Sequence, residues 1–409
     1  MAKKQRKYIY ISNLDYNGTV FQTQVLDWLH LFKKNNLEFD LIQTFHIKDI
    51  KRPKFIRQQL AGLRNSTRCY TGYLFLLPSK GILYFVNAFV IFCKIFKYIF
   101  QYKEILLFSR AIIGKEIGFL RRISPAEIIF FFDARAAAAE ENKYSAIKKH
   151  DFSLKKYLII ANIYYLVYKT LLAADKVFVV SKVLQKYFQD TYNIADKKFV
   201  YYPCLSDAGK FYFNPDIRRE LRNKLQISDQ ITVFVYSGGI ESDWHMTESM
   251  LTFFRHLLQY RKDILLLFLT KDKISLKKSL SEFPEIETYI LFFSVSNEEV
   301  YKYLNAADYG LLFRENTIMN NVASPTKFAE YMLCGLPVLI SEGVGDYSDY
   351  VINNNLGILI KEDGLKNPAK FDYINFPAKS FNRINIAEIG RKNFSKDSLI
   401  SKIIFELES

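Results

Sequence analysis

Residues 309–341 read YGLLFRENTIMNNVASPTKFAEYMLCGLPVLIS and contain a strand, a loop, a helix and a second strand. The runs YGLLF and PVLIS are apolar throughout, which is typical of strands covered on both faces. Between them, SPTKFAEYML has helical spacing, with Ser324 placed as the N-cap and Pro325 at the first helical position. Gly335 stands where a left-handed residue ends a helix. The stretch predicts a strand–helix–strand unit of a parallel sheet.

The same alternation runs along the whole chain of 409 residues, which is long enough for two domains. Further strands are predicted in KYIYIS (7–12), FDLIQT (39–44), EILLFS (104–109), EIIFFF (127–132), KVFVV (176–180), KFVYY (198–202), ITVFVY (231–236), ILLLFL (264–269), YILFFS (289–294) and GILI (357–360). Segments with helical periodicity separate them. We therefore expect an α/β fold of two tandem Rossmann-like, doubly wound parallel-sheet domains with an interdomain cleft.

The segment Tyr202–Phe213 interrupts both patterns and predicts the domain boundary. We expect an N-terminal domain over residues 1–205 and a C-terminal domain over residues 206–390. A final helix within residues 391–409 has no strand after it, and we expect it to pack back on the N-terminal domain.

The composition indicates a globular protein with a net charge of +15, which favours polyanionic partners. The basic residues are scattered, which suits a phosphorylated substrate or an anionic membrane surface better than nucleic acid, and no RNA-binding motif appears. The four cysteines lie far apart and are expected to be free thiols, without a metal site. No secretory signal is recognisable, so a cytoplasmic location is expected, with peripheral contact at the inner face of the cell membrane as a further possibility.

The segment Ile82–Phe100 is the strongest candidate for a membrane span. Asn87, Lys94 and Lys97 interrupt it, so we expect a buried or half-buried helix instead. Contact of this helix with a membrane surface stays open as an alternative.

The helix that begins near Ser324 is the best candidate for a binding site. Its N-terminal turn, Ser324–Lys327, combines the helix dipole with the Lys327 ammonium, which favours an anion such as a phosphate. Glu330 follows one turn later and could accept hydrogen bonds from a ribose diol. The alternative is a well-capped helix whose lysine and glutamate are merely solvated.

Several segments together resemble the retaining GT-B glycosyltransferases of family 4 (glycosyl transferases group 1). The P-x-K-x-x-E-Y helix followed by G-x-P-V is similar to the donor-binding helix of that family. Four more segments resemble the family in the same order: FDARAAAAEE (132–141), ADKVFVVS (174–181), YSGGIESDW (236–244) and AADYGLLFRE (306–315). The resemblance implies that the N-terminal domain binds the acceptor and the C-terminal domain binds a nucleotide-diphosphate sugar.

Roles for individual donor-side residues follow from the resemblance. Glu330 would bind the ribose, and Lys327 and Arg314 would neutralise the departing diphosphate. Gly238 and Gly239 would let the backbone approach the phosphates. The resemblance implies no metal or other cofactor, because cations of the protein would carry that charge.

The sequence departs from the family pattern at the donor sugar. The family's first glutamate falls at Val322, so Asn321, or alternatively Glu315 or Asn320, would contact the sugar. The turn after the strand ITVFVY also lacks the usual basic pair. His245 is a candidate substitute, and the alternative for this histidine is a structural role. These departures leave open the sugar and the retaining stereochemistry.

Acceptor-side residues are predicted after strands of the N-terminal domain. Asp133 and Arg135 follow EIIFFF, with Asp133 as the candidate general base, although family enzymes also use the leaving phosphate. Arg110, Glu140 and Glu141 are expected nearby. The loop Asn13–Gly18 is expected to face the cleft.

The sequence thus predicts a hexosyltransferase, of the retaining type, that builds a surface polysaccharide or glycoconjugate. The acceptor would be a glycan or a lipid-linked glycan, and no nucleic acid is expected as a partner. Two alternatives remain: a nucleotide-sugar epimerase of the same fold, and a non-catalytic sugar- or membrane-binding scaffold derived from such an enzyme.

Overall fold

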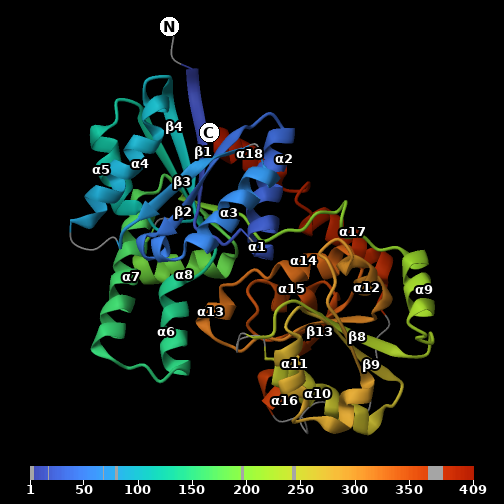
Figure 1. Ribbon diagram of the computed structural model, residues 1–409. Helices are drawn as coiled ribbons and strands as arrows, with labels where there is room; N and C mark the ends of the chain where they lie inside the picture. Colours follow the sequence, from blue (N-terminus) through green and yellow to red (C-terminus); the bar gives the residue numbers. More distant parts are fainter. Residues whose placement is uncertain are drawn as a thin grey trace. The chain divides into compact units, whose positions relative to one another are not determined.

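The computed structural model describes residues 4–16, 18–67, 69–78, 82–194, 198–241, 246–366 and 381–409. The chain divides into two compact units, one formed by Met1–Pro203 with Lys402–Ser409 and the other by Cys204–Ser401. Each unit is built around its own parallel sheet (Figure 1). His245, a predicted donor-side residue, lies outside the described residues.

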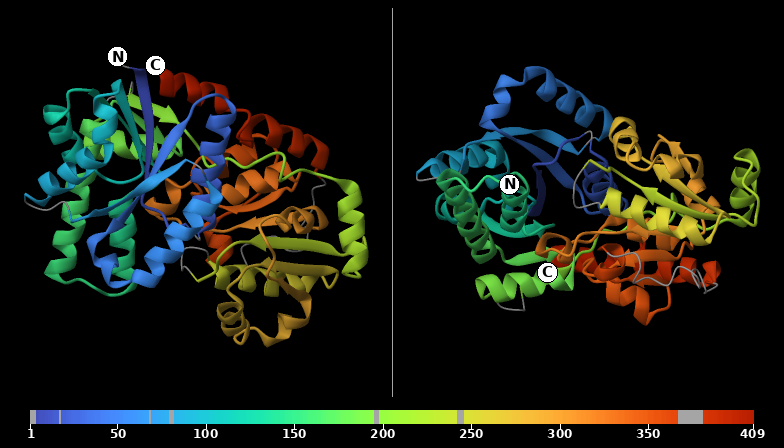
Figure 2. Two further views of the ribbon diagram at one scale, coloured as in Figure 1. Left: turned by 45° about the horizontal axis from the view of Figure 1, so that its top comes forward. Right: turned by 90° about the horizontal axis from the view of Figure 1, so that it is seen from below.

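Seven parallel strands form the sheet of the first unit, in the order β3-β2-β1-β4-β5-β6-β7. Their bounds are β1 Lys4–Ser12, β2 Phe39–His46, β3 Tyr70–Leu76, β4 Tyr102–Ser109, β5 Glu127–Ala134, β6 Lys176–Val179 and β7 Phe199–Tyr201. From β1 the chain first steps towards β3, and then it returns to β4 and steps the other way. Right-handed crossovers in these two directions place helices on opposite faces of the sheet, so that both faces are covered (Figure 2).

The helices of the first unit surround this sheet. They are α1 Thr19–Phe21, the π-helix η1 Gln22–Leu26, α2 Asp27–Lys34, the 3-10 helix η2 Ile47–Lys51, α3 Pro53–Ser66, α4 Leu83–Ile99, α5 Gly114–Ile123, α6 Ala138–Lys148, α7 Leu154–Ala173 and α8 Lys182–Tyr192. On one face α5 lies between α4 and α7 and contacts both. The C-terminal helix α18, Ile400–Glu408, lies against β1, where the Arg6 guanidinium donates to Leu407 O at 3.0 Å.

The second unit repeats the arrangement with six parallel strands in the order β10-β9-β8-β11-β12-β13. The strands are β8 Thr232–Ser237, β9 Ile264–Leu269, β10 Ile290–Phe293, β11 Tyr309–Leu312, β12 Val338–Ser341 and β13 Gly357–Ile360. The helices are α9 Pro215–Lys224, α10 Thr247–Tyr260, α11 Lys273–Leu280, the 3-10 helix η5 Pro284–Tyr289, α12 Val300–Ala306, α13 Ile318–Asn321, α14 Thr326–Leu333, α15 Tyr347–Asn353, α16 Glu362–Lys366 and α17 Arg383–Phe394. Phenylalanine, leucine and isoleucine side chains of β8, β9 and α10 fill its core.

The predicted fold class, two parallel-sheet domains of α/β type, is confirmed. One strand was missed, the edge strand β3, whose sequence YTGYLFL has small and polar residues and whose side chains alternate between partly buried and exposed. Its apolar run YLFL follows a threonine and a glycine, and these two residues interrupt the strand pattern.

The segment Ile82–Phe100 forms α4, a half-buried helix as predicted. It buries Ile91 and Ile95 against the sheet and exposes Phe89 and Phe96. No helix in the described part of the chain has the length and apolar character needed to cross a membrane.

Candidate functional site

The candidate donor site lies in the second unit, where β8 and β11 end and α14 begins. The carboxyl ends of parallel strands meet at one edge of a sheet, and ligands of doubly wound folds bind there. β8 and β11 are neighbours, and α14 follows β11 in the chain. The structure therefore brings together the predicted residues Gly238, Arg314, Lys327 and Glu330.

The turn after β8 has a backbone conformation that favours glycine. Gly238 has φ +133°, a conformation that L side chains rarely adopt. A Cβ atom on Gly238 would lie 3.1 Å from Lys327 Nζ. The Tyr236 hydroxyl donates to Gly239 O at 2.6 Å, and Asp272 Oδ2 accepts the Ile240 N–H at 2.8 Å. The turn is thus fixed with its backbone against the Lys327 ammonium.

Lys327 occupies the first turn of α14 and is held over an aromatic ring. Its Nζ lies 4.0 Å from the centroid of the Tyr236 ring. Burial, together with the nearby Arg314, lowers the pKa of Lys327 to about 7, although Glu330 opposes the shift. In the absence of a bound anion, the charged form of the Lys327 side chain is therefore unfavourable in free energy.

Arg314 follows β11 and supplies a second cation. Its Nη1 donates to Asn320 Oδ1 at 3.1 Å, and its backbone N–H donates to Ser341 Oγ at 2.8 Å. Its Nε is buried without a hydrogen-bond partner, and burial lowers its pKa. Neither Arg314 nor Lys327 forms a salt bridge with any of the residues that the structure describes. Two adjacent cations that form no salt bridge with a described carboxylate are suited to an anionic ligand.

Glu330 lies one turn further along α14 and is partly buried. Burial raises the pKa of Glu330 to about 7, against the influence of Lys327 and Lys396. Lys396 is itself buried, with 4% of its surface exposed, and it follows α17. A carboxylate set among lysines in a sheltered place can accept hydrogen bonds from hydroxyl groups.

The N-cap prediction for Ser324 is wrong. α14 begins at Thr326 with Pro325 as its N-cap residue, and no side chain caps it. The Ser324 hydroxyl instead accepts the Cys204 N–H at 3.0 Å and is bonded to the Tyr347 hydroxyl at 2.7 Å. Proline at the N-cap position leaves this serine one residue too early to cap the helix. The predicted left-handed end is confirmed, because Gly335 has φ +62°.

Asn321, the predicted contact of the donor sugar, ends α13. When the Asn321 side-chain amide is oriented so that both its oxygen and its nitrogen form hydrogen bonds, the nitrogen donates to Gly343 O at 2.6 Å and to Thr317 O at 3.0 Å. These bonds tie α13 to the loop after β12. The neighbouring Asn320 is buried and bonded to Arg314, as described above.

Sequence reasoning missed three residues that build this site. Tyr236 holds both the glycine turn and Lys327. The Tyr331 hydroxyl accepts the Ser237 N–H at 3.2 Å and donates to Leu311 O at 3.3 Å, which joins α14 to β8 and β11. Lys396 acts on Glu330 from a distant part of the sequence. Two signals for Tyr331 were available: it ends the P-x-K-x-x-E-Y motif, and a Cβ on Gly310 of β11 would lie 2.6 Å from its ring.

In the first unit, Asp133 ends β5 inside a buried network. Its carboxylate accepts the Tyr10 hydroxyl at 2.6 Å and Arg135 Nε at 2.5 Å. The Arg135 guanidinium also stacks over the Tyr202 ring at 4.3 Å. The Asp133 side chain has no exposed surface. Asp133 thus positions Arg135 and Tyr10 in the geometry described.

Arg110 and Glu140 form hydrogen bonds with different residues. Arg110 follows β4 and donates to Gln24 Oε1 at 3.2 Å through both terminal nitrogens, and its charge also acts on Tyr10. Glu140, in α6, accepts hydrogen bonds from the hydroxyls of Tyr164 and Tyr187. Of the predicted acceptor-side residues, Asp133, Arg135 and Arg110 therefore share a neighbourhood, and Glu140 belongs to a different one.

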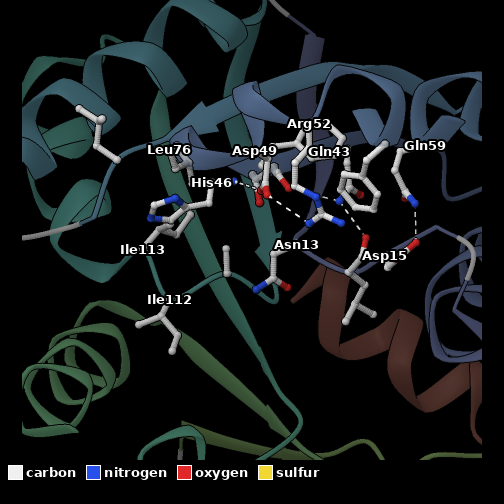
Figure 3. A pocket seen from close by; sticks show the side chains of 16 residues that line it. Asn13, Asp15, Gln43, His46, Asp49, Arg52, Gln59, Leu76, Ile112 and Ile113 are labelled. Carbon is white, nitrogen blue, oxygen red and sulfur yellow. Dashed lines mark hydrogen bonds and ion pairs between the residues drawn. The ribbon is translucent and has the colours of Figure 1, made fainter. Parts of the chain in front are cut away.

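A pocket of about 450 Å³ lies at the carboxyl edge of the first unit's sheet, between β1, β2, β3 and β4 (Figure 3). Asn13 and Asp15 from the predicted loop line it, as do Gln43, His46 and Arg52. Gln43 Oε1 is buried and has no hydrogen-bond partner among the described residues, while Gln43 Nε2 donates to Leu14 O at 2.9 Å. The pocket thus offers an unused acceptor among other polar groups, which suits a hydroxylated ligand. Without β3 and η2, neither of which was predicted, the sequence could not indicate it.

In the described part of the chain, no group of three or more His, Cys, Asp or Glu side chains could hold a metal ion.

Comparison with known proteins identifies the fold. No protein-family model matches the sequence, and no curated protein matches it. Among solved structures, the chain is similar to HepE of Anabaena in complex with UDP and glucose, with 13% identity, a TM-score of 0.64 and coverage of 99% of this chain and 100% of that chain. A glycosyltransferase from Rickettsia africae gives 14% identity and a TM-score of 0.65, over 99% and 98% of the two chains. A putative UDP-N-acetylglucosamine 2-epimerase from Listeria monocytogenes gives 12% identity and a TM-score of 0.52, over 99% and 95%. The chain therefore has the GT-B fold, and the resemblance stated from its sequence is confirmed at this level.

Proposed function

We propose that the protein is a glycosyltransferase that takes a sugar from a nucleotide diphosphate. The observation that carries the proposal is the pair of sheltered cations, Lys327 and Arg314, beside the glycine turn of Gly238. Their pKa values are lowered by burial, and no described carboxylate forms a salt bridge with them. The similar HepE protein has been solved in complex with UDP and with UDP-glucose, which supports a nucleotide diphosphate as the ligand.

In this proposal the second unit holds the donor. The diphosphate contacts Lys327, Arg314 and the backbone of Gly238 and Gly239, at the positive end of α14. Glu330 accepts hydrogen bonds from the ribose hydroxyls. Asn321, Ser324 and the loop after β12 form the neighbourhood of the sugar.

The reaction breaks the bond between the anomeric carbon and the diphosphate oxygen, and the diphosphate leaves with the electron pair. An acceptor hydroxyl forms the new bond to that carbon and loses its proton. Lys327 and Arg314 stabilise the charge that grows on the leaving group, which is commonly the largest contribution to such catalysis. The complete burial of Asp133 favours the positioning of Arg135 over proton transfer to Asp133, so the leaving phosphate is the better candidate base. A retaining outcome would fit this assignment.

The acceptor site in this proposal is the pocket at the edge of the first unit's sheet. Gln43 Oε1 would accept a hydroxyl hydrogen of a glycan or a lipid-linked glycan, and Arg110 and Arg135 lie on the acceptor side. Replacing Gln43 with Met should weaken binding of methyl glycosides about 5- to 10-fold, which corresponds to one lost hydrogen bond. Ligand-observed NMR would measure this, with the exposed Gln101→Met as the control.

The first experiment is thermal unfolding with UDP, GDP, ADP and CMP. A ligand at about 100 times its Kd stabilises a protein by about 2.7 kcal/mol, which gives a clear shift of Tm. We expect one diphosphate to stabilise the native chain and Glu388→Ala, an exposed α17 control. Glu330→Ala should lose most of the shift. Absence of any shift would favour the non-catalytic scaffold.

Turnover separates the two enzymatic candidates. A transferase consumes the donor only when an acceptor is supplied, apart from slow hydrolysis, and the NMR spectrum of its product gives the anomeric configuration. A nucleotide-sugar epimerase would interconvert the donor without any acceptor. Donor conversion in the absence of acceptor would therefore contradict the transferase.

A further inference from the structure

The helices α6 and α7 form an antiparallel hairpin that projects from the first unit (Figure 1). Its base is anchored on α8. Glu140 of α6 accepts hydrogen bonds from Tyr164 of α7 and Tyr187 of α8, and the rings of Tyr168 and Tyr192 stack at 6.4 Å. The hairpin is thus held firmly at one end.

The other end of the hairpin, residues 147–158, is here called the hairpin tip. It carries five large apolar side chains that are more than half exposed, from 51% for Ile147 to 75% for Phe152: Ile147, Phe152, Leu154, Tyr157 and Leu158. The buried residues of α7 are Val167, Thr170 and Leu171, all in its C-terminal half. An apolar helix half that the protein does not cover indicates an interaction surface.

The hairpin tip is positively charged as well as apolar. Lys148, Lys149, Lys155 and Lys156 lie within it, against a single acidic residue, Asp151. The Asp151 carboxylate accepts the Ser153 hydroxyl at 2.7 Å, and Ser153 caps α7 by accepting the Lys156 N–H at 3.2 Å. The one acidic group is therefore engaged in building the turn. Lysines interleaved with exposed aromatic and aliphatic residues are the composition of interfacial membrane segments.

We propose that the hairpin tip binds the surface of an anionic lipid bilayer. Phe152, Leu154 and Tyr157 would enter the boundary between headgroups and acyl chains, while the lysines contact lipid phosphates and keep their charges in water. The positive charge argues for this occupant over a second copy of the same basic chain, because like-charged tips would repel one another. This inference does not depend on the proposed function, although it would bring the enzyme to a lipid-linked acceptor.

Vesicle co-sedimentation tests the proposal with the full chain. We expect binding to phosphatidylcholine vesicles that contain phosphatidylglycerol, little binding to phosphatidylcholine alone, and weakening by salt. Lys149→Glu with Lys155→Glu should reduce partitioning by at least about 30-fold, since each lysine near an anionic surface contributes roughly fivefold. The matched control is Lys277→Glu with Lys278→Glu on α11, which changes net charge equally and should retain most of the binding.

The apolar part is tested with Phe152→Ser, whose control is Phe405→Ser at a similarly exposed position of α18. Phe152→Ser should reduce partitioning about tenfold, and Phe152→Trp should show a blue-shifted emission on anionic vesicles. All these positions are exposed, so unchanged thermal unfolding is expected.

Three results would overturn the proposal. They are no binding to anionic vesicles, binding that the tip variants leave intact but Phe89→Ser on α4 abolishes, or a dimer that dissociates in Phe152→Ser. The UDP-induced Tm shift, measured on the same variants, is a separate readout. A loss of vesicle binding with that shift intact would therefore leave the donor site untouched.

Discussion

The helices α5 and α14 follow corresponding central strands of the two sheets, yet their first turns differ in chemistry. Each begins without a side-chain cap and carries a lysine at its second residue, Lys115 in α5 and Lys327 in α14. In α5 the first N–H is donated to Thr170 Oγ1 at 3.1 Å, and Lys115 Nζ lies over the Tyr84 ring at 4.2 Å. In α14 the lysine faces a glycine turn and a second cation.

The difference shows that a helix N-terminus with a lysine does not by itself make an anion site. The first turn of α5 is closed by α7, because a Cβ on Gly114 would lie 2.3 Å from Thr170 Cα. The first turn of α14 instead faces Gly238, where an added Cβ would lie 3.1 Å from Lys327 Nζ. What distinguishes the two sites is the environment that each fold builds around the same local motif.

The largest expected effect on UDP affinity is that of Lys327→Met, compared with Lys115→Met as its control. Lys327→Met should weaken UDP binding by about 100-fold or more, because a charge-assisted contact to the diphosphate is lost. It should also raise the stability of the free protein by about 1–2 kcal/mol, since a partly buried cation that forms no salt bridge with a described residue is removed. The gain is largest below pH 7, where the ammonium is charged in the folded and the unfolded chain, and it fades towards the ordinary pKa of lysine, 10.5.

Lys115→Met is the matched control, and it should leave UDP affinity unchanged. Calorimetry gives the affinities, and urea unfolding gives the stabilities. Equal losses of affinity in the two variants would contradict the assignment of the donor site to the second unit.

Only the α14 side of this contrast was predicted from the sequence, and the limit has a physical reason. Lys327 and Glu330 were found because helix spacing fixes their relation within a single element. Tyr236 and Lys396 could not be found in that way, because their roles arise from packing between distant segments. The Ser324 prediction was wrong because Pro325 starts the helix one residue later than the cap pattern indicated. Strand β3 was missed because a threonine and a glycine before its apolar run YLFL interrupt the strand pattern.

The second comparison uses one glycine from each region. Gly238→Ala should lower the free energy of unfolding by about 1–3 kcal/mol, because alanine is strained at φ +133° and its Cβ would approach Lys327 Nζ to 3.1 Å. Gly118→Ala, within α5, should raise it by about 0.5–1 kcal/mol, because outside the helix's own backbone no described atom lies within 4 Å of the added Cβ. Urea unfolding measures both. A stable Gly238→Ala with native UDP affinity would show that the glycine turn is unimportant.

The pH dependence of binding sharpens the role of Lys327. Its pKa of about 7 in the free protein means that, above pH 7, binding of a diphosphate must be accompanied by proton uptake. Affinity for UDP should therefore fall by up to about tenfold per pH unit between pH 7 and the pKa of the bound state. Calorimetry in buffers of different ionisation enthalpy would detect the protons. In Lys327→Met the slope should disappear, and a slope that survives there would assign the proton to another group.

The smallest expected effect is a change in stability at the start of α5, where Thr170 accepts the Gly114 N–H. Thr170 is fully buried, and its hydroxyl accepts the Gly114 N–H and donates to Leu166 O at 2.8 Å. Thr170→Val should lower the free energy of unfolding by about 1 kcal/mol, because the N–H at the start of α5 loses its partner. Thr170→Ser keeps the hydroxyl and should retain that hydrogen bond. Neither change should alter UDP affinity, since α5 is closed by protein where α14 is proposed to receive a ligand. A nucleotide effect of Thr170→Val that Thr170→Ser lacks would mean that the two helix ends are coupled.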